Sequence, residues 1–164
     1  MVTVGLAGAL LGMANDLITS TLSPDYFVYF KGIEPGQEFR RNVLLLGSQA
    51  GLAAGAVGSG ILLLCCKGKG SKDKQDGAKR RRSPIPMLLP LVKWPFLSAI
   101  AGGFSLGMVA HLLQWPRALG DVNGLLNGTQ VQWLHTVWLT HIGLYLGAVL
   151  GLIGIITVVR RKLL

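Results

Sequence analysis

The chain has 164 residues and a formal net charge of +9; 51% of its residues are hydrophobic and only 14% are charged. Glycine is abundant, with 23 residues, and most of the charge lies in one run and at the ends of apolar segments. This composition is typical of an integral membrane protein and argues against a soluble globular domain.

Four apolar segments are long enough to cross a membrane. Residues 43–66, 94–114 and 131–159 contain no charged side chain, and helices of these lengths can span a hydrocarbon core of about 30 Å. The segment 2–22 is interrupted by Asn15 and Asp16. It has no basic region before it, so we expect a retained first helix and not a cleaved signal peptide. The sequence therefore predicts an all-α, integral membrane four-helix bundle.

Asp16 lies near the end of the first helix, on the face that also carries Gly5 and Gly12. This position directs the carboxyl group into the packed interior, where an acid in a membrane helix needs a partner or water. A second interpretation is that Asp16 lies at the hydrated interface and bonds to loop backbone. Both interpretations stay open at this point.

The segment after the first helix begins with Ser23, Pro24 and Asp25. A serine N-cap, a proline at the first helical position and an acid in the first turn together indicate a helix start. Four aromatic side chains follow, which we expect to lie at head-group depth as an interfacial anchor. We therefore predict a short helix along the outer surface in the loop 23–42. The aromatic residues are Tyr26, Phe27, Tyr29 and Phe30.

The stretch from Asp16 to Phe27, "DLITSTLSPDYF", resembles a signature found in a group of small, functionally uncharacterised bacterial multi-pass membrane proteins. In that group an Asp-x-Val/Ile-Thr block leads into Ser-Pro-Glu-Tyr-Phe after the first helix, and Asp25 stands here where Glu is usual. The last helix of the group tends to carry His and Tyr beside glycines, similar to His141, Tyr145 and Gly147. The resemblance implies the multi-pass architecture and a bacterial origin, and implies no activity.

Residues 67–86 form a strongly basic loop, and the chain ends in further basic residues at 160–162. The positive-inside rule places both on the cytoplasmic side, so both termini are expected to be cytoplasmic, in a bacterial inner membrane. Because the basic run has no aromatic residues, we interpret it as a solvated loop that contacts anionic lipid head groups and not nucleic acid. The residues expected to do so are Lys79, Arg80, Arg81 and Arg82.

The two halves of the chain, 1–66 and 87–164, resemble each other. "GLAAGAVGSGILLL" from Gly51 aligns with "GLYLGAVLGLIGII" from Gly143 at an offset of 92, and "LGMAND" aligns with "LGMVAH" at an offset of 95. We therefore predict two duplicated helical hairpins related by an axis along the membrane normal. The alignment makes Asp16 equivalent to His111, and we predict that the two side chains meet.

Glycines recur at helical spacing in every predicted helix. Such small faces let two backbones approach closely, which favours helix packing in lipid but carries no chemistry. The predicted packing positions are Gly5, Gly8, Gly12, Gly47, Gly51, Gly55, Gly58, Gly103, Gly107, Gly143, Gly147, Gly151 and Gly154.

His111, His141 and Tyr145 complete a hypothetical polar centre with Asp16. Histidines at similar depth in two helices also permit a haem or a chlorophyll-type pigment, although no attachment motif is present. A divalent metal on Asp16, His111 and His141 would have suitable ligand types, but we assign no metal site. An intramembrane histidine is more often hydrogen-bonded to a neighbouring helix.

No nucleotide-binding loop or catalytic motif is present, so an enzyme is not expected. The leading hypothesis is a non-catalytic subunit or scaffold whose glycine faces pack against itself or against other membrane-protein subunits. One alternative is a small transporter or ion-handling protein using Asp16 with His111 or His141. The other is a haem- or pigment-binding membrane subunit.

Overall fold

A computed structural model describes residues 2–67, 91–113 and 125–163, and these ranges contain helices and no strand. The all-α, four-helix architecture predicted from the sequence is confirmed. The elements in chain order are α1 (Val2–Leu22), η1 (Tyr26–Phe30), α2 (Phe39–Lys67), α4 (Lys93–Leu113) and α5 (Gly128–Leu163). The predicted lipid-contact residues 79–82 lie outside the described residues.

The observed helix ends follow local chemistry. α5 begins at Gly128, three residues before the predicted start, because Asn127 caps it. The Asn127 side chain accepts a hydrogen bond from the Gln130 amide at 2.9 Å, and the Gln130 side chain accepts one from the Asn127 amide at 3.0 Å. This reciprocal pair is a capping box. Helix α1 ends at Leu22, ahead of Pro24, which has no amide hydrogen to continue the helix.

All four long helices are apolar enough to cross a membrane. Their outer faces carry many large exposed hydrophobic side chains, including Leu10 at 67%, Phe104 at 67% and Leu150 at 67% exposure. Apolar surface on this scale is typical of contact with lipid. The chain is therefore an integral membrane protein.

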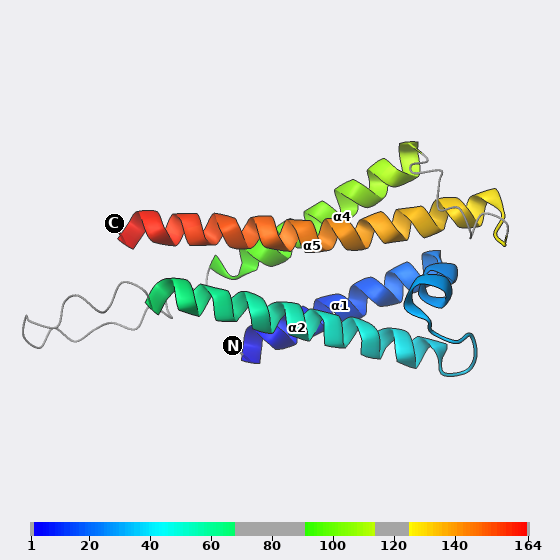
Figure 1. Cartoon of the computed structure of the whole chain (residues 1–164), viewed down its shortest axis with the longest axis horizontal. Helices are drawn as coiled ribbons and strands as arrows, with labels where there is room; N and C mark the ends of the chain where they lie inside the picture. The colour runs from blue at the N-terminus through cyan, green and yellow to red at the C-terminus, as the bar shows by residue number, and fades with distance from the viewer. Residues whose placement is uncertain (1, 68–90, 114–124, 164) are drawn as a thin grey trace, which may run out of the picture.

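The helices form two antiparallel hairpins, α1 with α2 and α4 with α5, which lie side by side in Figure 1. In the first hairpin the backbones meet at glycines. A methyl group on Gly51 would overlap the carbonyl oxygen of Gly8, and one on Gly12 would overlap that of Gly47. One turn further along, a methyl group on Gly55 would lie 2.9 Å from the Cα of Gly5. We call this line of contacts the first seam.

The second hairpin has a seam of the same plan. A methyl group on Gly143 would overlap the carbonyl of Gly102, and one on Gly147 would lie 2.9 Å from the Cα of Ala99. Gly107 lies against the Thr140 side chain, so one contact of this seam joins a glycine to a threonine. Gly103 and Gly151 also lie in this seam.

Two predicted packing glycines lie in neither seam. A methyl group on Gly58 or on Gly154 would meet no atom within 4 Å. Gly58 instead lines the space between the hairpins, whereas Gly154 lies on the exposed surface.

The ends of the bundle differ in character. Lys67, Lys93 and Arg160 lie at the end that also holds both chain termini, here called the basic end (Figure 1). The opposite end holds η1 and the start of α5. The hairpins are joined near both ends by apolar clusters. An aromatic cluster beside η1 contains Tyr26, Phe27, Ile33, Val43, Leu134 and Val137, and an aliphatic cluster near the basic end contains Leu62, Ile155 and Val159.

Candidate functional site

A buried acid–histidine pair links the two hairpins. Asp16 on α1 and His141 on α5 are each 6% exposed, and Asp16 Oδ1 lies 2.9 Å from His141 Nε2. Asn15 bridges both groups, with its Nδ2 at 3.1 Å from each of these two atoms. Gly47 makes room for the pair, because a methyl group there would lie 3.0 Å from the Asp16 Cβ.

The contact made by the second ring nitrogen of His141 determines how many protons the pair holds. His141 Nδ1 lies 2.8 Å from the carbonyl oxygen of Val137, and a carbonyl only accepts, so Nδ1 carries a proton. One further proton must then lie between Nε2 and Asp16 Oδ1, either on the imidazolium or on the carboxylic acid. In both states the pair has no net charge, which suits an apolar surrounding.

The η1 turn covers the pair on the side away from the basic end. The Tyr26 ring stacks on the His141 ring with centroids 4.8 Å apart, and the Phe27 ring meets it edge-on at 6.1 Å. Tyr26 and Phe27 are 3% and 0% exposed, so their rings pack inside the protein and do not face lipid, whereas their depth at the head groups stays a prediction. They turn inward because both hairpins offer them apolar surface. Tyr29 and Phe30 remain exposed.

Local bonds hold η1 in this position. Ser23 Oγ accepts a hydrogen bond from the Tyr26 amide at 3.4 Å, as expected of an N-cap. The turn ends at Gly32, whose φ of 66° lets the Ile33 amide bond to the Phe27 carbonyl at 3.0 Å. Burial, with smaller contributions from Tyr145 and Asp16, raises the pKa of Tyr26 well above its ordinary value. The Tyr26 phenol is therefore protonated at neutral pH, and its uncharged ring packs over His141.

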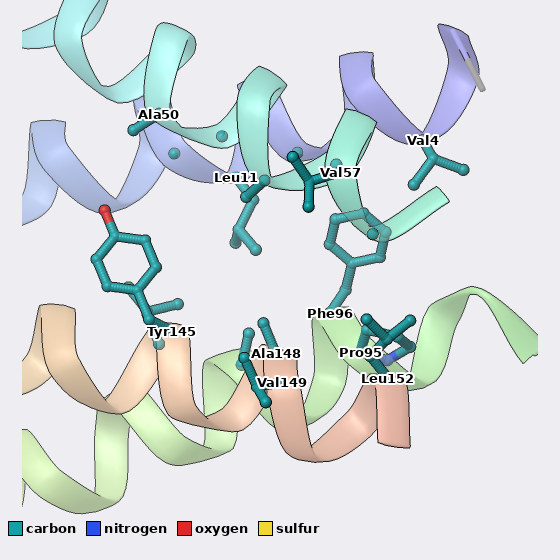
Figure 2. Close-up of a pocket in the computed structure, with 18 of the residues that line it drawn as sticks. Val4, Leu11, Ala50, Val57, Pro95, Phe96, Tyr145, Ala148, Val149 and Leu152 are labelled. Atoms are coloured by element: carbon teal, nitrogen blue, oxygen red, sulfur yellow. The ribbon is translucent and has the colours of Figure 1, made fainter. Parts of the chain in front are cut away.

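Below the pair lies a cavity of about 320 Å³ between the hairpins, lined by all four long helices. The ring of Tyr145 projects into it from α5, and that of Phe96 projects into it from α4 (Figure 2). The lining is apolar except near the pair, where Asn15 and Asp16 reach it, and at Ser59. Its volume is at the lower end of the range of ordinary ligand pockets, about 300–1,000 Å³.

Helix lengths give the depth of the pair. Arg160 follows His141 by 19 residues on α5, a rise of about 28 Å. Lys67 follows Gly47 by 20 residues on α2, a rise of about 30 Å. If the basic end lies at one surface, the pair lies near the opposite edge of a hydrocarbon core of about 30 Å, with the cavity inside the core.

The predicted contact between Asp16 and His111 is wrong. His111 belongs to the second seam, where its Nδ1 lies 3.3 Å from Thr136 Oγ1 and its ring lies 4.5 Å from that of Trp133. His111 thus bonds within its own hairpin, whereas Asp16 bonds across to the other hairpin. The polar centre instead unites Asp16 and His141, with Tyr145 beside them in the cavity lining.

This geometry bears on the haem and metal alternatives. Both ring nitrogens of His141 already have partners, so this imidazole offers no free nitrogen to iron. Within the described residues, no group of three His, Cys, Asp or Glu side chains is placed to hold a metal ion. The ligand set of Asp16, His111 and His141 is not assembled.

The bridging role of Asn15 was not predicted from the sequence, and the signal was its place next to Asp16 within an otherwise apolar helix. The imidazole of His135 is 3% exposed, and its Nε2 has no hydrogen-bond partner among the described residues. It is not among the cavity-lining residues.

Comparison of the chain with protein-family models, with curated proteins and with solved structures gives no match.

Proposed function

We propose that this chain is a non-catalytic membrane carrier that binds a small solute between its two hairpins, with Asp16 and His141 as the polar centre. The observation that supports this most is the position of the pair, which lies at one end of an apolar cavity formed by all four long helices. An ionisable residue inside a membrane protein commonly marks a substrate or ion pathway.

The distribution of packing contacts also supports a carrier. The seam glycines bring α1 against α2 and α4 against α5, so each hairpin is a tightly packed unit. Between the units, the aromatic and aliphatic clusters lie at opposite ends and leave the cavity between them. A pair of units joined in this way can admit a ligand while each seam stays intact.

A thermal-stability panel tests the proposal. The purified protein in detergent is mixed with lipid-soluble compounds that are cationic, neutral or anionic. A true ligand at about 100 times its Kd stabilises the folded state by about 2.7 kcal/mol. Ala148 lines the cavity, so Ala148→Trp should abolish the effect. Ala53, exposed on α2 and not among the lining residues, gives the control Ala53→Trp, which should keep it.

If no compound of any charge stabilises the wild type more than Ala148→Trp, the proposed binding function is contradicted. Selective stabilisation of the wild type by any one charge class supports it.

The proposed localisation is a bacterial inner membrane with the basic end in the cytoplasm, on the positive-inside argument. Single cysteines at Glu34 and Lys93, in a background with Cys65 and Cys66 replaced by alanine, test the orientation. Glu34 lies in the exposed loop near η1 and Lys93 lies at the basic end. We expect an impermeant thiol reagent to label only Glu34→Cys in intact cells. Labelling of only Lys93→Cys would reverse the orientation.

A second candidate function is that of a subunit or scaffold in a homo-oligomer or larger complex. Gly154 favours it, because this small residue on the exposed surface of α5 leaves open space that another helix could fill. Native mass measurement of gently extracted protein distinguishes the candidates. A free-standing carrier gives a defined small assembly of this chain alone, whereas a subunit copurifies with other chains in fixed proportion.

A further inference from the structure

The charges around the cavity are few. From the sequence, α2 has no acidic or basic side chain between Arg41 and Lys67, and α4 has none between Lys93 and His111. Among the described residues, those that line the cavity include no lysine or arginine, and Asp16 is their only acid. Within this set, an anionic ligand would therefore meet a carboxylate and no fixed positive charge.

Few titratable groups surround the Asp16–His141 pair. Among titratable groups, η1 presents Tyr26, whose ring stacks on His141 and lies under the Lys31 ammonium at 5.5 Å. α5 presents Tyr145 beside His141, while α2 presents Gly47 and α4 presents no ionisable group to the pair. The proton between His141 and Asp16 is thus the one that a ligand at this end of the cavity would meet.

We propose that the cavity takes a lipophilic monovalent cation, such as an ammonium with apolar substituents, in exchange for the proton shared by Asp16 and His141. This inference rests on the proposed carrier function and names its substrate class. The apolar lining holds the substituents, and the ring of Tyr145 lines the cavity one helical turn from His141, where an aromatic ring attracts a positive charge.

The exchange balances in protons and charge. Before binding, the pair holds one proton between Nε2 and Oδ1 and is neutral. The entering cation brings one positive charge, pairs with the Asp16 carboxylate, and one proton leaves to the solvent. His141 is then neutral, with its Nδ1 proton still bonded to Val137. Its Nε2 lone pair then accepts a hydrogen bond from Asn15, whose Nδ2 already lies 3.1 Å away. The site is neutral again, which an apolar surrounding requires.

Three probes of nearly equal size isolate the effect of charge: benzyltrimethylammonium, its uncharged carbon isostere neopentylbenzene, and the anion benzylsulfonate. Binding to the full chain in lipid nanodiscs is measured against the Ala148→Trp variant, which corrects for partition into lipid. We expect binding of the cation only. Its apparent Kd should rise about tenfold for each unit of falling pH while the pair keeps its proton. A weakly buffered sample should release one proton per bound cation.

Asp16→Asn should lose cation binding, whereas Asp25→Asn, an acid on the same side but not in the lining, should retain it. If Asp16→Asn does not fold, the proton-release measurement on the wild type still decides. Cation binding without proton release overturns the exchange. Binding of the neutral or anionic probe in place of the cation overturns the substrate class and leaves the carrier function standing. Absence of binding by all three probes and by the wider panel overturns both.

Discussion

Within each hairpin the two helices touch backbone to backbone at glycines, whereas the hairpins meet each other through two side-chain clusters and one polar pair. The first kind of contact tolerates no added atom. The second kind leaves a partly open cavity between the hairpins. The difference teaches that glycine contacts fill one interface completely, whereas side-chain contacts confined to the two ends of the other leave space between them.

The largest expected effect comes from breaking a seam. A leucine at Gly51 would overlap the Gly8 backbone, which cannot give way as a flexible side chain would. We expect Gly51→Leu to destabilise the protein by about 3 kcal/mol or more, at the upper end of overpacking effects. Thermal unfolding in detergent measures it. A Cβ at Gly60, on the same helix, would meet no atom within 4 Å, so the control Gly60→Leu should unfold close to the wild type. Equal losses from both variants would contradict the seam.

The polar pair should give the next largest effect. Asp16→Asn and His141→Gln each leave a buried partner poorly satisfied, with an expected cost of about 1–3 kcal/mol in thermal stability. In a double-mutant cycle the two changes should be non-additive by more than about 0.5 kcal/mol. The matched cycle of Asp16→Asn with His111→Gln should be additive, because His111 bonds to Thr136 instead. Additivity in the first cycle and non-additivity in the second would instead show that Asp16 contacts His111.

Because Tyr26 packs on His141 between the hairpins, we expect the stability of the protein to fall at alkaline pH. The folded pKa of Tyr26 is raised above the unfolded value of 10.0, so its contribution to stability is complete below pH 10 and is lost as pH rises beyond it. The loss cannot exceed about 1.4 kcal/mol per pH unit. Tyr26→Phe should flatten this alkaline decline in the unfolding temperature, whereas Tyr29→Phe, at an exposed position, should not. Identical alkaline profiles for the wild type and Tyr26→Phe would show that the phenol is not buried.

The smallest effect should come from the cap of α5, which lies away from both seam and pair. Asn127→Ala removes one half of an exposed capping box and should lower stability by about 0.5–1 kcal/mol. Thr129→Ala is the control, since it leaves both bonds of the capping box in place. Equivalent unfolding temperatures for the two variants would mean that the cap adds nothing to the folded bundle.

Sequence reasoning predicted the elements better than their partners. Uncharged lengths and glycine spacing predict the four helices, because membrane spans and close backbone contacts each impose a local pattern. The face of Asp16 was also predictable from helical periodicity. Its partner was not, since the repeat alignment relates positions by symmetry and gives no distance between them. His141 faces the first hairpin because the opposite face of α5 is occupied by the seam, a fact that only the packed structure supplies.

The inward turn of Tyr26 and Phe27 was missed for a related reason. Composition alone cannot separate an aromatic residue at a lipid interface from one that closes a core, because both environments suit an aromatic ring. The four aromatics of η1 divide between the two roles. The two that pack on His141 are buried, and Tyr29 and Phe30 are exposed.

The separation of the pair along the chain has a consequence for biosynthesis. Asp16 and His141 are 125 residues apart, while every contact of the first seam lies within the first hairpin. At about 5–20 residues per second, His141 is synthesised roughly 6–25 s after Asp16. During that interval the first hairpin can enter the membrane and close, with Asn15 as the neighbour that bonds to the acid. Asn15 is next to Asp16 in the sequence and 3.1 Å from its Oδ1 in the folded protein, so it is the polar partner that the acid can keep from synthesis to the folded state.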